Sequence, residues 1–125
     1  MLGKADATPM IAVKDLDRAR KFYEETLGLK TKDEWGGEGV TLKSGDTVVN
    51  VYKSEFAGTN KATTLTFDVD DIEEEVRLLK DKGVFFEKYD LPGLEPRGDL
   101  YVGDGMKTAW FKDPDGNILS LIQGE

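Results

Sequence analysis

Residues 8–28 read TPMIAVKDLDRARKFYEETLG, and residues 64–83 read TLTFDVDDIEEEVRLLKDKG. Both segments begin with Thr, have Val five residues later and Asp seven residues later, and end at Gly after a stretch with helical spacing. The second copy begins 56 residues after the first. Because an internal repeat indicates that one structural unit occurs more than once, we expect two related modules.

Each copy predicts a strand that leads into a helix. In the first copy, residues 10–13 form the strand, the Asp15 carboxylate caps the helix, and Gly28 ends it. The second copy repeats this arrangement, with Asp71 as the cap and Gly83 at the end.

Three short strands are predicted after each helix, because apolar runs there are separated by turn residues. These strands are residues 29–34, 40–43, 47–52, 84–89, 107–112 and 118–122. A module at 6–53 and a module at 62–123, joined by a linker at 54–61, make up a single domain of residues 1–125. Residues 90–105 are expected to be a long loop. The predicted fold class is therefore α+β, with two βαβββ modules.

The chain of 125 residues contains no Cys and no His. The absence of Cys excludes disulfides, thiolate metal sites and a Cys nucleophile. The absence of His excludes the usual Ser-His-Asp triad and the commonest metal ligand. Any catalysis would use carboxylates, Lys, Tyr, Ser or Thr, and any metal site would be built from oxygen atoms.

The net charge of −8 comes from the second half of the chain. Residues 1–62 carry ten basic and ten acidic side chains, whereas residues 63–125 carry seven basic and fifteen acidic ones. Such a chain repels phosphate backbones and anionic membranes, so neither nucleic acid nor a membrane is an expected partner. No apolar run is long enough to span a membrane, and residues 1–10 contain no apolar signal segment, so we expect a cytoplasmic protein.

Three segments together resemble a known family. They are VKDLDRARKFYEETLGLK at 13–30, VDDIEEEVRLLKDKG at 69–83 and AWFKDPDGNILSLIQ at 109–123. In order and spacing they resemble the vicinal oxygen chelate superfamily, which includes glyoxalase, bleomycin-resistance proteins, fosfomycin-resistance enzymes and extradiol dioxygenases. The resemblance implies that the modules form a curved mixed sheet around a ligand cavity. It also implies a homodimer, because many members cover their exposed sheet edges by pairing modules.

The resemblance further implies where a metal ion would bind. Active members carry His, Gln or Glu on the first and last strands of each module, and in this chain those positions are Thr8, Asn50, Thr64 and Ser120. None of these is a carboxylate or an imidazole, and a hydroxyl or amide oxygen brings no charge to offset the dehydration of a divalent ion. We therefore predict no metal site and no cofactor.

The same polar positions suit a ligand pocket, in which a few hydrogen-bonding side chains orient a molecule among apolar ones. Strand alternation adds neighbours on the same face, and the resemblance to fosfomycin-resistance enzymes adds two residues on the strand at 107–112. The predicted ligand-binding residues are Thr8, Met10, Val48, Asn50, Tyr52, Thr64, Thr66, Thr108, Trp110 and Ser120. Trp35, Phe86 and Tyr101 are candidates to complete an aromatic wall.

Three functions follow as hypotheses. The first is a metal-free protein that binds a small molecule, either a drug or a metabolite, without changing it. The second is a lyase, isomerase or dioxygenase-like enzyme with an oxygen-only metal site or a carboxylate base, for which the candidates are Glu38, Asp46, Asp68 and Asp104. The third is a structural or regulatory dimer with a vestigial cavity. Under the first hypothesis, the acidic second half predicts a preference for planar ligands that are neutral or cationic.

Overall fold

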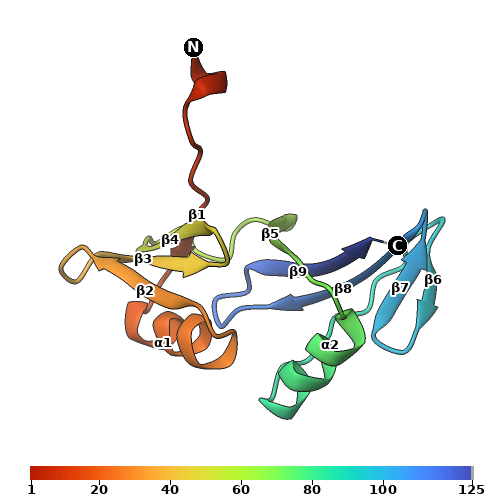
Figure 1. Cartoon of the computed structure of the whole chain (residues 1–125). Helices are drawn as coiled ribbons and strands as arrows, with labels where there is room; N and C mark the ends of the chain where they lie inside the picture. The colour runs from red at the N-terminus through yellow and green to blue at the C-terminus, as the bar shows by residue number, and fades with distance from the viewer. Residues whose placement is uncertain (125) are drawn as a thin grey trace. The chain divides into compact units, whose positions relative to one another are not determined.

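The computed structural model describes residues 1–124 and forms two compact units, Met1–Thr59 and Asn60–Glu125 (Figure 1). Each unit has its own mixed sheet and its own helix, so the predicted α+β class with two related modules is confirmed. The boundary between the units falls inside the predicted linker 54–61. A short helix, η1 (Leu2–Lys4), precedes the first sheet.

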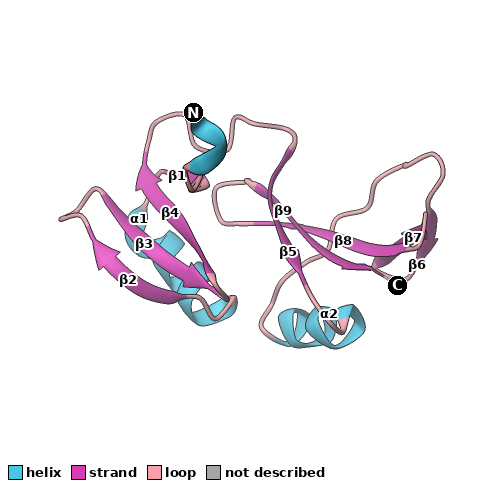
Figure 2. Ribbon diagram, turned by 45° about the horizontal axis from the view of Figure 1, so that its top comes forward, coloured by secondary structure: helices cyan, strands magenta, loops and turns pink. Residues whose placement is uncertain are grey.

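The first unit is a four-stranded sheet with a helical segment on one face (Figures 1 and 2). Its elements are β1 (Met10–Val13), α1 (Leu16–Arg20), the π-helical stretch η2 (Lys21–Thr26), β2 (Lys30–Glu34), β3 (Gly39–Ser44) and β4 (Thr47–Lys53). The strand order is β1-β4-β3-β2, in which β1 is parallel to β4 and the other pairs are antiparallel.

Alternation along the strands explains which face of this sheet meets the helix. Val49 and Val51 of β4 are buried, and so are their partners Leu42 and Val40 on β3. Contact between α1 and β4 places these four side chains beneath the helical segment, which contributes the fully buried Tyr23. Since each buried aliphatic side chain contributes roughly 1.5–3 kcal/mol, this face holds the unit together.

The predicted helix limits are confirmed, but its geometry changes partway. Asp15 accepts a hydrogen bond of 3.2 Å from the backbone N–H of Arg18, and Gly28 follows with a φ of +83°. Between these limits the α-helix gives way to a wider turn, in which the N–H of Leu27 donates to the carbonyl of Phe22. The spacing of apolar residues alone does not reveal such a widening, because both forms present nearly the same face.

The second unit is a five-stranded sheet that carries α2 (Ile72–Asp81). Its strands are β5 (Thr63–Asp68), β6 (Glu95–Arg97), β7 (Leu100–Gly103), β8 (Met106–Lys112) and β9 (Ile118–Gly124). The order is β5-β9-β8-β7-β6, in which β5 is parallel to β9 and the other pairs are antiparallel. As in the first unit, the strand before the helix pairs in parallel with the last strand.

Two predicted elements of the second unit are wrong. Residues 84–89 form only a single bridge, from Phe86 to Phe111, and the predicted loop 90–105 contains β6 and β7. The reason is competition for one edge of β8: β7 pairs with residues 106–108, which leaves the 84–89 segment only the far end of that edge. All three residues of β6, Pro96 included, are exposed, so the strand shows no alternation of buried and exposed side chains. It tolerates proline because it lies at the sheet edge.

Polar contacts fix the start of α2 on its sheet. Asp71 caps the helix as predicted, accepting a hydrogen bond of 3.2 Å from the N–H of Glu74. The side-chain oxygen of Gln123 on β9 accepts from the N–H of Ile72 at 2.7 Å, and Lys107 on β8 pairs with Glu73 at 3.0 Å. The bonds from the N–H groups of Glu74 and Ile72 satisfy donors that a helix start would otherwise leave unpaired.

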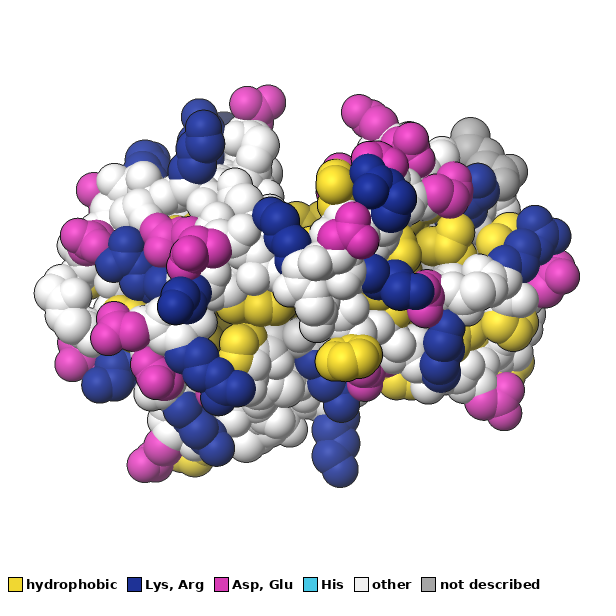
Figure 3. Space-filling view, turned by 90° about the horizontal axis from the view of Figure 1, so that it is seen from below, with side chains coloured by type: hydrophobic (Ala, Val, Ile, Leu, Met, Phe, Trp, Pro, Cys, Tyr) yellow, Lys and Arg dark blue, Asp and Glu magenta, His cyan; other side chains and the backbone are white. Residues whose placement is uncertain are grey.

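The outer surface mixes charges of both signs. On the face drawn in Figure 3, Lys and Arg side chains are interspersed with Asp and Glu rather than separated into patches. Within residues 1–124, no helix is both long enough and apolar enough to cross a membrane.

Candidate functional site

Most predicted ligand-binding residues of the first unit lie on the sheet face that points away from its own helix, here called the far face. Val48, Asn50 and Tyr52 alternate with the buried residues of β4, and Met10 of β1 pairs with Asn50. Thr8 differs, because it is exposed and precedes β1.

A chain of hydrogen bonds crosses the far face of the first unit. The indole Nε1–H of Trp35 donates to Thr41 Oγ1 at 3.1 Å, and the Thr41 hydroxyl donates to Asn50 Oδ1 at 2.7 Å. The Asn50 amide nitrogen then lies 3.3 Å from the sulfur of Met10. Thr41, Asn50 and Met10 are direct cross-strand partners, so this chain follows one row of the sheet.

Gly39 determines where the Trp35 ring lies. A Cβ atom at Gly39 would stand 2.5 and 2.7 Å from two carbons of that ring and 2.9 Å from the carbonyl oxygen of Val51. The indole therefore lies directly on the glycine backbone. Only a residue without a side chain permits this approach.

The far face of the second unit carries the matching row. Thr66, Ser120 and Trp110 are cross-strand partners on β5, β9 and β8, and Thr66 follows Met10 by the 56-residue offset of the repeat. The hydroxyls of Thr66 and Ser120 are hydrogen-bonded at 2.7 Å. Thr108, two residues before Trp110, pairs with Ile122 on the same face.

Trp110 stands at the centre of an aromatic cluster. Its ring meets those of Tyr101 and Tyr89 edge to face, with centroids 5.5 and 5.7 Å apart. Its Nε1–H donates to Thr63 Oγ1 at 3.2 Å. Of the residues predicted for an aromatic wall, Tyr101 packs against Trp110, whereas Phe86 is buried against Phe111 on the helix side of the sheet.

The hairpin that carries Tyr101 is tied down at two points. The Tyr101 hydroxyl donates to the backbone carbonyl of Tyr89 at 3.0 Å. Asp99 lies 2.8 Å from Lys80 of α2 and 3.0 Å from Lys88, and the hydrogen bonds from these ammonium groups hold the pKa of that carboxyl below its ordinary value. These contacts keep the Tyr101 ring against Trp110.

Two buried hydroxyls of the second unit have no hydrogen-bond partner among residues 1–124: Thr64 Oγ1 and the Tyr89 hydroxyl. Thr64 lies where the pairing of β5 with β9 shifts register, so the alternation predicted from Thr64 to Thr66 is interrupted. Burial raises the pKa of the Tyr89 hydroxyl above its ordinary value.

The four positions implied as metal ligands do not suit a transition metal ion. Asn50 Oδ1 already accepts a hydrogen bond from Thr41, and the Ser120 hydroxyl is hydrogen-bonded to Thr66. Neither Thr8 nor Thr64 supplies a charge that would offset the dehydration of the ion. Within residues 1–124, no group of three or more Asp, Glu, His or Cys side chains could hold a metal ion.

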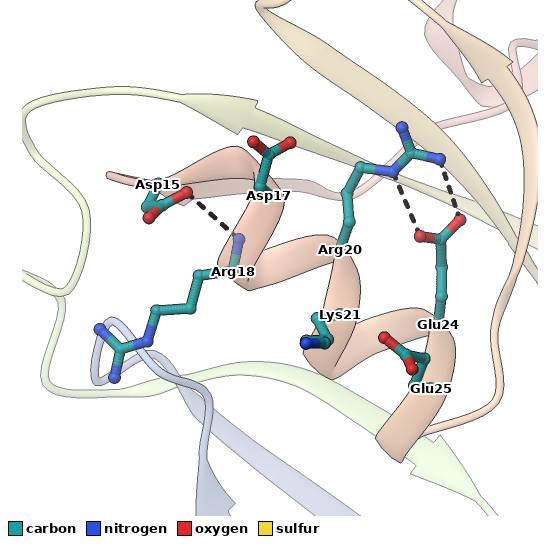
Figure 4. A pocket seen from close by; sticks show the side chains of 7 residues that line it. All are labelled: Asp15, Asp17, Arg18, Arg20, Lys21, Glu24 and Glu25. Atoms are coloured by element: carbon teal, nitrogen blue, oxygen red, sulfur yellow. Dashed lines mark hydrogen bonds and ion pairs between the residues drawn. The ribbon is translucent and has the colours of Figure 1, made fainter.

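Within residues 1–124, neither the candidate catalytic carboxylates nor the charged hollow along α1 and η2 forms a site as ordered as the two far faces. Glu38, Asp46, Asp68 and Asp104, the candidate bases, are all exposed. An open hollow of about 640 Å³ follows α1 and η2, where Arg20 is bound to Glu24 and the Asp15 carboxylate caps the helix (Figure 4). Its lining mixes both charges and consists of Asp15, Asp17, Arg18, Arg20, Lys21, Glu24 and Glu25.

Sequence reasoning missed three residues that contribute to these faces: Thr41, Thr63 and Tyr89. A signal for Thr41 was available, because it alternates with the apolar Val40 and Leu42. The sequence held no such signal for Thr63 or Tyr89. The contact of Thr63 with Trp110 depends on the register shift of β5, and Tyr89 lies outside any strand.

Comparisons with known proteins agree with this fold. The family model described as "Glyoxalase/Bleomycin resistance protein/Dioxygenase superfamily" matches residues 7–121. Among proteins with curated functions, none matches the chain significantly.

Several solved structures share the whole fold. A glyoxalase family protein from Enterococcus faecalis is 25% identical, with a TM-score of 0.73 over 98% of this chain and 99% of that one. A lactoylglutathione lyase from Agrobacterium tumefaciens is 18% identical, with a TM-score of 0.72 over 97% and 94%. TnmS3, an antibiotic binding protein from a Streptomyces species, is 19% identical, with a TM-score of 0.63 over 98% of each chain.

Proposed function

Because this chain belongs to the glyoxalase, bleomycin resistance protein and dioxygenase superfamily, we propose that it is a metal-free protein that binds a small organic molecule, a drug or a metabolite, on its far faces. One observation carries this proposal: each far face holds hydroxyl and aromatic groups, joined on the first by the Asn50 amide, that are already ordered by hydrogen bonds. Ordered polar groups among aromatic rings orient an organic ligand, and they lose little entropy when it binds.

The similarity to an antibiotic binding protein is consistent with this proposal. The net charge of −8 favours cations over anions at long range, and the half-buried Trp110 offers a π-face to a planar ring. The proposed ligand-binding residues remain Thr8, Met10, Val48, Asn50, Tyr52, Thr64, Thr66, Thr108, Trp110 and Ser120. A homodimer and a cytoplasmic location belong to the same proposal.

A thermal-shift titration with a matched pair of compounds tests the function. At low salt, 1-naphthylmethylammonium is expected to stabilise the protein more than 1-naphthoate does, and the difference is expected to shrink at physiological salt, where the Debye length is about 8 Å. If the anion stabilises the protein and the cation does not, the charge argument is wrong.

The same titration on two variants identifies the binding face. Trp110→Ala is expected to weaken binding of the cation about tenfold, because it removes the central ring of the cluster. Thr64→Val is the comparison variant and is expected to weaken binding less, because it removes at most one neutral hydrogen bond to the ligand from the unpartnered Thr64 hydroxyl. Equal effects of the two variants would place the ligand elsewhere.

Elemental analysis tests the metal-free part of the proposal. The purified protein is expected to carry no stoichiometric Zn, Ni, Fe or Mn, because the oxygen donors at Asn50 and Ser120 are neutral and already hydrogen-bonded. A near-stoichiometric metal that is lost from an Asn50→Leu, Ser120→Ala double variant would overturn this part and favour the enzyme hypothesis.

A further inference from the structure

The direction of the hydrogen-bond chain in the first unit is set by chemistry. An indole N–H can only donate, so Thr41 Oγ1 is the acceptor of the bond from Trp35. A threonine hydroxyl has a single proton, and Thr41 directs it to Asn50 Oδ1 at 2.7 Å. The chain therefore runs one way, from Trp35 through Thr41 to Asn50.

This direction leaves the Asn50 amide nitrogen facing outward as a donor. Its hydrogen-bond partner is the thioether sulfur of Met10 at 3.3 Å, and a thioether is a weak acceptor. Met10 is 51% exposed, so a bound molecule can reach the same position. The amide has two N–H groups, and an oxygen acceptor would bond either more strongly than sulfur does.

The Trp35 ring supplies a fixed surface beside this donor. Its carbons lie against the backbone of Gly39, and its Nε1–H is held by Thr41. The backbone N–H of Trp35 also donates to the Gly39 carbonyl at 2.9 Å. Because the ring is held at two points and its backbone at a third, it loses little freedom when a flat molecule packs against it.

We propose that the Trp35–Thr41–Asn50 chain makes the first far face a subsite for planar ligands that present an acceptor oxygen, such as a ring carbonyl, to the Asn50 amide N–H. This inference rests on the proposed function and adds the ligand chemistry. Asn50 orients the ligand by donating a hydrogen bond to its oxygen. Thr41 is a positioning residue that acts through Asn50.

Two neutral bicyclic probes of similar size test the proposal on the full-length, ¹⁵N-labelled chain. Coumarin has a lactone carbonyl and no donor, whereas indole has one N–H donor and no oxygen. Coumarin is expected to bind about tenfold more tightly than indole and to shift the Asn50 side-chain amide signals. Equal affinities, or a preference for indole, would overturn the proposal.

Three variants separate a donor role from a merely structural one. Asn50→Asp keeps the acceptor for Thr41 but removes the N–H groups, so coumarin affinity is expected to fall about tenfold, whereas indole, whose N–H can donate to the carboxylate, is not expected to bind more weakly. Thr41→Val is expected to lower coumarin affinity several-fold and to move the Asn50 amide signals even without ligand. Thr41→Ser retains the hydroxyl and is expected to behave as the unmodified protein does.

The outcomes distinguish this proposal from the proposed function. If the naphthyl cation binds at Trp110 but Asn50→Asp leaves coumarin affinity unchanged, the acceptor subsite is wrong and small-molecule binding stands. If Thr41→Val leaves the Asn50 amide signals of the free protein unchanged, the hydrogen-bond chain itself is wrong. If neither coumarin nor the naphthyl cation binds at millimolar concentration, both proposals fail.

Discussion

Replacing Phe111 with alanine is expected to lower the free energy of unfolding by about 3–5 kcal/mol. Phe111 is completely buried on β8, and its ring meets that of Phe86 with centroids 5.6 Å apart. It is also the sheet residue with which the 84–89 segment forms its β-bridge, through Phe86. Alanine would leave a cavity that the packed strands around it could close only in part.

Phe85→Ala is the matched control, because Phe85 is 85% exposed although it stands next to Phe86 in the sequence. Its replacement is expected to change the free energy of unfolding by less than about 0.5 kcal/mol. Chemical denaturation followed by circular dichroism measures both variants. A loss below about 1 kcal/mol for Phe111→Ala would show that the second unit does not depend on this contact.

Replacing Asp113 with alanine is expected to cost about 2–4 kcal/mol of stability. Asp113 is 4% exposed, and its carboxylate accepts three hydrogen bonds inside the β8–β9 turn. They come from the backbone N–H groups of Asp115 and Asn117, both at 2.9 Å, and from the Asn117 side chain at 2.8 Å. Without the carboxylate, the buried Asn117 donors lose a charged partner.

The control is Asp46→Ala, which makes the same change in the exposed β3–β4 turn. It is expected to alter stability by less than about 0.5 kcal/mol. The same denaturation experiment compares the two variants. Equal effects of Asp113→Ala and Asp46→Ala would mean that the carboxylate at 113 is not needed to form its turn.

Much of this fold could be predicted because the signals are local. Asp15 and Asp71 cap their helices through bonds to residues three positions away, and alternation along β4 and β8 marks the buried face. The resemblance to the superfamily singled out Asn50 and Trp110, and both lie on the faces opposite the helices. Their role in ligand binding stays a prediction.

Competition between segments could not be predicted, because it depends on energies of pairing that no single segment contains. Residues 84–89 have stronger strand character than Glu95–Arg97, yet the latter pair with β7 and the former make one bridge. The shift between Thr63 and Leu65 is of the same kind. Because of this shift, the Trp110 indole N–H donates to Thr63, a partner that strict alternation along β5 would not predict.

The sequence by itself determined that two copies of one strand–helix–strand unit exist and which face of each strand is apolar, since the repeat and the period of two are written in residue order. Only the tertiary structure decided the orientation of the Asn50 amide, because Trp35, Thr41 and Met10 come from separate parts of the chain and meet only across paired strands. A hydrogen bond between distant residues acquires its direction only when the sheet brings donor and acceptor together.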